Sequence, residues 1–319
     1  VTVSGNEQQR KNIRKGLVTS IDVCTDDANR AFLLSQLQLC STTEDAPTFI
    51  KYLEDKYLSD YAIRGLIAMS GSDEIILDLM RQDKISRKVW AHAAGERNLV
   101  SAEPILLKWL NNADANTRIA ILKALATCGT SASLKVLAAS AKTEGFEWNK
   151  EKEATASYLC VLNRMASNEE KAVNAAKKLL KNKKAYLRGA ALDVILSAKG
   201  TEGMSYVLFA LKDKDIEVRN SALRSISQFA NDEVYASIAK WLPALSDDAC
   251  VDVITWFGNR HATSQIDVIV ENMKSKNDAL ATAAISAAGR IGGSKALHAL
   301  IAQLGEQHAD KAAKALLAF

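Results

Sequence analysis

An acidic and a basic residue recur four positions apart in this sequence, a combination that could carry chemistry or hold a scaffold together. In "DKDIEVRNSALRSI" (213–226), Asp215 precedes Arg219. The same positions return elsewhere as Asp26 with Arg30, Asp60 with Arg64, and Asp114 with Arg118, while Arg87 and Arg188 lack the acid. Because a catalytic pair would not be copied into several units, we interpret it as structural. The aspartate can cap a helix, and the arginine can pair with it or with a neighbouring unit's acid, for about 0.5 kcal/mol per exposed pair.

Other groups with catalytic or metal-binding potential are scattered. Metal-ligand spacing and His-Glu dipeptides are absent around His92, His261, His298 and His308. The five cysteines include no CxxC pair, so they predict neither a zinc site nor a disulfide framework, and we expect Cys128 and Cys160 in the core. The glycines of "IGGSKALHAL" (291–300) lack phosphate-loop spacing and indicate a turn before a helix capped by Ser294. We therefore expect no enzyme activity, no metal and no cofactor.

Composition narrows the class of protein further. Apolar residues make up 48% of the chain, only three residues are proline and aromatics reach 6%, a profile typical of all-helical proteins. The sequence contains no run of eighteen apolar residues, so we expect no membrane span. The net charge of +4, from 41 basic and 37 acidic residues, gives no general indication of nucleic-acid binding. The chain begins with Val1, which we interpret as a trimmed start, so the compartment stays open between cytoplasm and bacterial envelope or periplasm.

Apolar positions recur every 31 residues. One ladder contains Cys160-Val161, Ala191-Leu192, Ala222-Leu223, Val253-Ile254, Ala284-Ile285 and Ala315-Leu316. A second contains Val207, Ile238, Ile269 and Leu300, followed four residues later by Leu211, Leu242, Met273 and Leu304. Spacings of three and four within a unit predict helices, and the 31-residue interval predicts units that stack on one another.

Each unit is predicted to contain two helices, called A and B in chain order. A B helix is expected over about 215–229 and the next A helix over about 232–242. Turn and first-turn residues support this division: Gly129, Gly200, Gly293, Pro47, Pro104 and a capping box at Ser167-Asn168-Glu169-Glu170. We expect one array, residues 1–319, with capping helices within 1–25 and 307–319 and about nine B helices in the repeats, 26–306.

The units resemble HEAT repeats of the short type found in phycobilisome lyase-like proteins, on the residues of "DIEVRNSALRSI". This resemblance covers about residues 26–319 and implies an all-α, right-handed solenoid of about nine helical hairpins. It says little about function, because such arrays serve as scaffolds, lyases, glycosylases and regulators. HEAT-like di-iron hydroxylases carry His-Glu ligand pairs, which this sequence lacks. More loosely, "GNEQQRKNIRKGLVTSI" followed by "FLLSQLQLC" is similar to helical arrays attached to keto-disaccharide hydrolase-like domains of bacterial envelope proteins, which implies a further domain of the same polypeptide.

The B helices of a solenoid line its concave side, which offers a long surface to a partner. The positions predicted to face solvent there are Lys88, His92, Ile119, Lys123, Tyr158, Leu162, Gly189, Asp193, Asn220, Arg224, Val251, Thr255, Thr282 and Ser286. We expect an apolar centre flanked by a basic rim, formed by Ile119, Tyr158, Leu162 and Val251 with Lys88, Lys123 and Arg224. Alternatively, these apolar residues cover one another, or the unit that is longer by about eight residues shifts the register.

The extra residues of the long unit fall in "TEGFEWNKEKE" (143–153), which we expect to be a loop. Phe146 and Trp148 lie in this loop, where an insertion commonly decorates a binding face or an aromatic residue folds over the core. The other tryptophans are expected to pack in the core: Trp90, Trp109, Trp241 and Trp256.

These patterns predict a non-catalytic scaffold that binds a protein or another extended ligand on its concave surface. A nucleic-acid-binding array of the glycosylase type is the first alternative, supported by the basic cluster "KKLLKNKKAYLR" (177–188) but opposed by Asp193 and the scarcity of basic residues on the inner surface. An accessory helical module of a larger carbohydrate-active envelope protein is the second. We expect a protein partner rather than nucleic acid.

Overall fold

The computed structural model describes residues 7–317, and its regular elements are helices apart from one isolated bridge between Asn149 and Lys152. Contacts divide the chain into two compact units, and the division falls within α10 (Ala154–Met165), between Val161 and Leu162. Among the described helices, none has the length and apolar character needed to cross a membrane.

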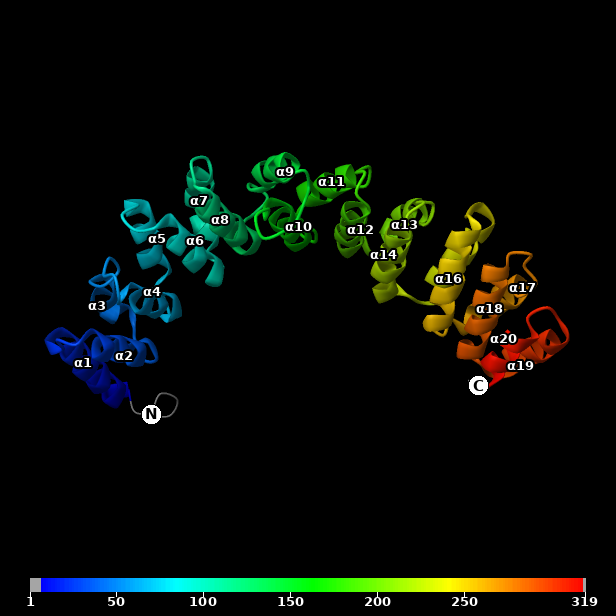
Figure 1. The fold of residues 1–319 in the computed structure, drawn as a ribbon, viewed down its shortest axis with the longest axis horizontal. Helices are drawn as coiled ribbons and strands as arrows, with labels where there is room; N and C mark the ends of the chain where they lie inside the picture. The colour runs from blue at the N-terminus through cyan, green and yellow to red at the C-terminus, as the bar shows by residue number, and fades with distance from the viewer. Residues whose placement is uncertain (1–6, 318–319) are drawn as a thin grey trace. The chain divides into compact units, whose positions relative to one another are not determined.

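The first unit begins with α1 (Glu7–Val23) and continues as alternating A and B helices. Its A helices and their 3-10 turns are η1 (Thr43–Asp45) with α3 (Ala46–Ile50), α5 (Asp73–Gln82), η2 (Val100–Ala102) with α7 (Glu103–Leu110), and α9 (Leu134–Thr143). The B helices that precede α10 are α2 (Asp27–Gln38), α4 (Ser59–Ala68), α6 (Arg87–Glu96) and α8 (Ala115–Cys128). Helix α6 packs along α8, and each packs on the A helix that precedes it (Figure 1).

The second unit has the same alternation. Its A helices are α11 (Glu170–Leu179), η3 (Gly200–Gly203) with α13 (Met204–Leu211), α15 (Asp232–Ala239) with η5 (Leu242–Ala244), η6 (Thr263–Gln265) with α17 (Ile266–Asn272), and α19 (Gly293–Ala302) with η7 (Gln303–Gly305). Its B helices are α12 (Ala185–Lys199), α14 (Ile216–Ile226) with η4 (Ser227–Phe229), α16 (Asp247–Asn259), α18 (Asp278–Ile291) and the short α20 (Ala309–Leu316). The predicted fold class, an all-α array of stacked helical hairpins, is confirmed.

Several helix starts follow the predicted cap chemistry. The side chains of Asp26, Asp114 and Asp215 each accept a hydrogen bond from a backbone N–H in the first turn of their helix. Pro47 and Pro104 lie in first turns, where the missing N–H costs nothing.

Other predicted turn signals were wrong. The capping box at Ser167 does not form. The backbone N–H groups of Asn168 and Glu169 instead donate to the carbonyl of Met165, and α11 begins only at Glu170. Ser294 does not cap α19, since the positive φ values of Gly292 and Gly293 start the helix before it. Gly129 ends α8 with an ordinary negative φ.

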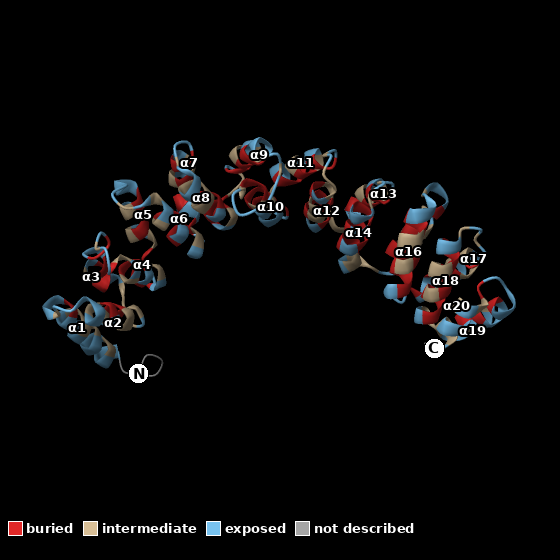
Figure 2. Cartoon of the chain, in the orientation of Figure 1, coloured by how far each residue is buried: buried red, intermediate tan, exposed pale blue. Residues whose placement is uncertain are grey.

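The 31-residue ladders form the core of the second unit. The pairs Ala191-Leu192, Ala222-Leu223, Val253-Ile254 and Ala284-Ile285 are buried, as is the second ladder from Val207 to Leu300 (Figure 2). Leu304 is instead 44% exposed, because Gln303 takes the buried position in η7. At the other end, Cys160 is exposed and Val161-Leu162 form the buried pair. The interval therefore predicts the core well where the units have equal length.

Most of the tryptophans that were predicted to pack in the core are buried. Trp90, Trp109 and Trp256 are buried, whereas Trp241 is only half-buried before η5. The indole N–H of Trp256 donates to Ser227 Oγ at 2.8 Å, which satisfies its polar atom.

Small residues allow neighbouring B helices to approach closely. A Cβ built on Gly258 in α16 would lie 2.7 Å from the Cα and 2.8 Å from the Cβ of Ala287 in α18. Because backbone atoms cannot move aside as a flexible side chain can, this contact sets the distance between the two helices.

Gly258→Ala should therefore destabilise the protein, by about 1–3 kcal/mol from overpacking. Gly16→Ala is the matched control, because no atom lies within 4 Å of a Cβ built there. It should instead stabilise by about 0.5–1 kcal/mol through the reduced entropy of the unfolded chain. Calorimetric melting of both variants measures this, and a Gly258→Ala protein that melts at or above the wild-type temperature would contradict the close approach.

Candidate functional site

A groove lies between α6 and α8 on the B-helix face, meaning the solvent-facing side of the B helices. It has a volume of about 760 Å³, within the range of about 300–1,000 Å³ typical of ligand sites. Four residues predicted from the sequence line it together: Lys88, His92, Ile119 and Lys123. We call this feature the α6–α8 groove. It belongs entirely to the first unit.

The floor of the α6–α8 groove consists of small residues. Ala91 and Gly95 of α6 lie opposite Ala120 and Ala124 of α8. A Cβ on Gly95 would lie only 3.2 Å from the Cα of Ala124, so the helices meet closely at this point. Small side chains at the crossing leave the longer lysines to form the walls.

The insertion loop supplies another wall residue, Lys150, which the sequence analysis did not single out. Phe146 adopts a positive φ of 53° and donates its N–H to the carbonyl of Ala141 at 2.7 Å. Glu144 accepts a hydrogen bond from the N–H of Ala154 at 3.0 Å, which ties the two ends of the loop together. Its position inside the insertion is the sequence feature that could have identified Lys150 as a groove residue.

The two loop aromatics that were predicted as binding residues differ in exposure. Phe146 is half-buried, whereas Trp148 is 72% exposed. Neither lines the α6–α8 groove. Lys150 of the insertion therefore lines the groove and the two predicted aromatics do not, and a binding role for Phe146 and Trp148 stays a prediction.

The charge of the α6–α8 groove is unbalanced. Lys88, Lys123 and Lys150 line it, and the one acidic residue of its lining is Glu96, whose carboxylate lies 3.9 Å from His92 Nε2. Glu153 lies near Lys123: burial raises the pKa of Glu153, the charge of Lys123 opposes this, and Glu144 raises the pKa further. Three lysines against one lining carboxylate leave an excess of positive charge in the groove.

The predicted apolar centre of the surface was wrong. Tyr158 is 5% exposed and Leu162 is 0% exposed, so both belong to the core, and burial raises the pKa of Tyr158. The long unit shifts the register of α10 by one residue, so that Asn163 takes the exposed position predicted for Leu162. Ile119 and Val251 are half-buried, on α8 and α16.

Two of the predicted contact residues of the second unit, Asp193 and Arg224, contact each other. Arg224 Nη2 lies 3.6 Å from Asp193 Oδ2, and Asp193 also accepts a hydrogen bond from Ser225. Arg224 lines a smaller groove of about 330 Å³ together with Asp252 and Thr255. Asp193 and Arg224 are therefore already neutralised as a pair.

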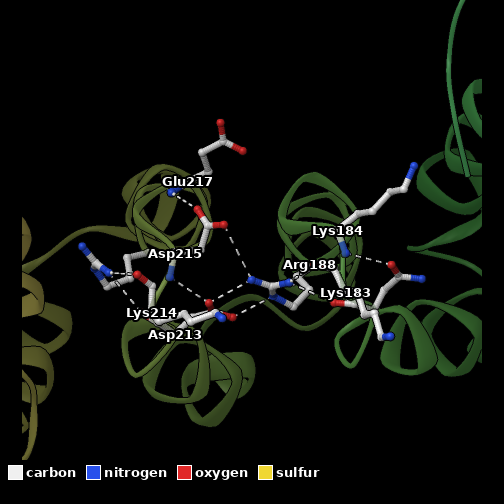
Figure 3. A network of polar contacts seen from close by, with 9 residues as sticks. Lys183, Lys184, Arg188, Asp213, Lys214, Asp215 and Glu217 are labelled. Atoms are coloured by element: carbon white, nitrogen blue, oxygen red, sulfur yellow. Dashed lines mark hydrogen bonds and ion pairs between the residues drawn. The ribbon is translucent and has the colours of Figure 1, made fainter.

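Two of the recurring arginines, Arg188 and Arg219, join neighbouring repeats of the array, whereas Arg30 pairs with Asp27 of its own helix. Figure 3 shows Arg188 of α12 between two residues of the next unit, donating to Asp213 at 2.7 and 2.9 Å and lying 3.9 Å from Asp215. Arg219 of α14 donates likewise to Asp252 of α16 at 2.5 Å. Each of these arginines pairs with an acidic residue of the next helical repeat, which is one of the two arrangements predicted from the sequence.

These ion pairs are less exposed than predicted. The side chains of Arg219 and Asp252 are 5% and 10% exposed. Arg188 also donates to the carbonyls of Asn182 and Lys183, and Arg219 to those of Asp213 and Lys214. The prediction of a weak exposed pair was therefore wrong here, because the guanidinium also satisfies the turn carbonyls and the stacked helices exclude water.

The cysteines differ in environment. Cys128 and Cys250 are buried, Cys24 and Cys40 half-buried, and Cys160 exposed, contrary to the prediction for the last. Burial and the charge of Asp45 raise the pKa of Cys40, and burial and Asp247 raise that of Cys250. Within residues 7–317, no group of three His, Cys, Asp or Glu side chains is arranged to hold a metal ion.

Comparisons with known proteins found no matching family model and no matching curated protein. Similar solved structures include an engineered protein, with 16% identity over 96% of this chain and 98% of that chain and a TM-score of 0.41. Human deoxyhypusine hydroxylase in complex with glycerol is 14% identical over 98% and 96%, with a TM-score of 0.32. YibA of Escherichia coli is 17% identical over 99% and 97%, with a TM-score of 0.33.

Likeness at this level carries no inference about what the chain binds or does. The chain is a helical repeat protein. Its finer resemblance to phycobilisome lyase-type HEAT repeats remains a prediction.

Asp252→Asn should strongly destabilise the protein, because it leaves the buried guanidinium of Arg219 without its carboxylate. Breaking a buried pair in this way costs about 3–5 kcal/mol. Asp22→Asn is the control, since its partner Lys51 and Asp22 itself are both exposed. Denaturant unfolding followed by circular dichroism should show a large loss for the first variant and almost none for the second. Equal losses would contradict a buried ladder.

Asp213 should make stability depend on pH in the acid range. Burial raises the pKa of Asp213, but the hydrogen bonds from Arg188 and the Asp215 N–H, with the charges of Arg188 and Arg219, outweigh it and lower the pKa below 3.8. Its contribution is therefore present above pH 3.8 and lost as the pH falls through the lowered folded value. Wild type should exceed Asp213→Asn in stability at pH 7, and the difference should shrink below pH 3.8 in denaturant titrations. A difference that stays constant down to pH 2 would refute this assignment.

Proposed function

We propose that this chain is a non-catalytic scaffold that binds a protein partner on its B-helix face, with the α6–α8 groove as a contact site. The observation that carries this proposal is the convergence of Lys88, Ile119, Lys123 and Lys150 on one groove of about 760 Å³. The repeat interval aligns Lys88 with Ile119 on neighbouring B helices, and Lys150 of the insertion joins them from outside the repeat.

The chemistry of the groove favours binding over catalysis. Its lining contains lysines, amide side chains and small residues, but neither a cysteine nor a serine, and its His92 and Glu96 side chains are both exposed to water. The half-buried Ile119 lies beside exposed charges, and a mixed surface of this kind is common where proteins meet.

A nucleic-acid-binding array is the alternative, and one surface of the second unit favours it. Lys178 at the end of α11 and Lys181 and Lys183 in the turn before α12 are exposed, and Lys184 Nζ lies 6.0 Å from the centre of the partly exposed Tyr186 ring. Lysines with an aromatic ring are the elements of single-strand recognition. We rank nucleic-acid binding second because Lys177 and Lys178 lie in the C-terminal turn of α11, where the helix dipole stabilises positive charge.

Photo-crosslinking tests the proposed function. A photoreactive amino acid in place of Ile119 should yield protein crosslinks in an extract of the organism that encodes the chain. The same residue in place of Leu107, half-buried on A helix α7, is the control and should not give these crosslinks. Mass spectrometry after nuclease treatment identifies the species. Crosslinks that disappear with nuclease, or that are the same at both positions, would contradict the proposal.

A further inference from the structure

The lysines of the α6–α8 groove differ from most arginines of residues 7–317, which take part in hydrogen bonds or ion pairs within the protein. Within residues 7–317, Lys88, Lys123 and Lys150 make no ion pair with an acidic side chain within 4 Å and donate no hydrogen bond to the protein. Arg87, next to Lys88, donates to Asp83 and to Asn112 and lies 5.6 Å from the centre of the Trp109 ring. Of these two adjacent residues, Arg87 therefore has a structural role and Lys88 faces the open groove.

We infer that the α6–α8 groove binds an extended peptide segment rich in carboxylates, an inference that rests on the proposed function. A cleft lined by one sign of charge concentrates its field and attracts the opposite charge. Three cations against the single lining carboxylate of Glu96 make such a cleft. The complementary ligand is therefore an anion with several separated charges.

Lysine suits separated carboxylates on a flexible chain. Its ammonium group is a point charge with three rotatable donors on a long stem, whereas arginine imposes a planar, two-pronged geometry. Lys88 lies in the first turn of α6, Lys123 in the middle of α8 and Lys150 in the insertion loop, so the three charges surround the groove from different sides.

The floor of the groove fits the rest of a peptide. Ala91, Gly95, Ala120 and Ala124 leave room for a main chain close to the helices, and Ile119 offers an apolar contact. Asn98 and Asn116 bring amide groups that can bond peptide N–H and C=O groups. Such a site admits a short extended segment.

The same features distinguish a peptide from a nucleic acid. No Phe, Tyr or Trp lines the α6–α8 groove, so the imidazole of His92 is the only ring of its lining on which a base could stack. Glu96 would repel a phosphate at its position, and a nucleic acid carries one charge on every nucleotide. A peptide can place an uncharged residue beside Glu96 and its carboxylates beside the lysines.

Fluorescence anisotropy with a labelled, end-capped peptide of eight alternating Glu and Leu residues tests the inference. Wild type should bind it, with affinity that falls as salt rises. Lys88→Gln/Lys123→Gln/Lys150→Gln should weaken binding by about tenfold or more. The control Lys108→Gln/Lys135→Gln/Lys142→Gln removes three exposed lysines from A helices α7 and α9 of the same unit and should stay within about twofold. Circular dichroism establishes that both variants are folded.

Three results would overturn the inference. These are equal losses in both triple variants, undiminished binding of the peptide with Gln in place of Glu, and tighter, groove-dependent binding of an eight-residue oligothymidylate. The last result would assign the groove to nucleic acid. If the peptide does not bind while the photoreactive residue at position 119 still crosslinks a protein, only the preference for carboxylates is refuted. Failure of crosslinking would remove the scaffold function itself.

Discussion

Every helical hairpin in this protein depends on its neighbours to shelter its apolar face from water. A short hairpin has no core of its own, so Ala222 and Leu223 of α14 are buried only because helices of the adjoining units cover them. Close contacts such as Gly258 with Ala287 fix the separation of the B helices. The interface between units is therefore the most constrained part of the chain, and the solvent-facing side of the B helices is the part left free to vary.

Arg188 and Arg219 provide hydrogen-bond donors for backbone carbonyls that the stacking of repeats covers. The last carbonyls of an A helix and its turn lack intrahelical donors, and the neighbouring unit covers part of that turn. Arg188 and Arg219 each supply two hydrogen bonds to turn carbonyls and a further bond to a carboxylate of the next unit. At the corresponding position of α16, 31 residues after Arg219, the thiol of Cys250 donates to the carbonyl of Leu242. The turn carbonyl thus keeps a donor even where the charge is absent.

The fold could be predicted from the sequence because the same apolar interval acts on every unit. The interval also placed Lys88, His92, Ile119 and Lys123 correctly, since α6 and α8 precede the insertion. It failed at Cys160, Tyr158 and Leu162 for a geometric reason. Each helical residue turns by about 100°, so a slip of one residue across the insertion exchanges exposed and buried positions. The path of the inserted loop has no period, and the approach of Lys150 to the groove was therefore not predictable by counting.

The arginines of this array and the lysines of the α6–α8 groove are used differently. Arg188, Arg219 and Arg87 each carry out a definable structural task, which accounts for their burial or pairing. Lys88 lies one residue from Arg87, and thus on a different side of α6, where stacking requires nothing from it. A single such lysine would be an ordinary solvated side chain. Three of them line one groove. The repeat interval accounts for Lys88 and Lys123, which lie on neighbouring B helices, but not for Lys150, which comes from the segment that interrupts the repeat. The proposed binding of an acidic ligand gives the third lysine a role at this position.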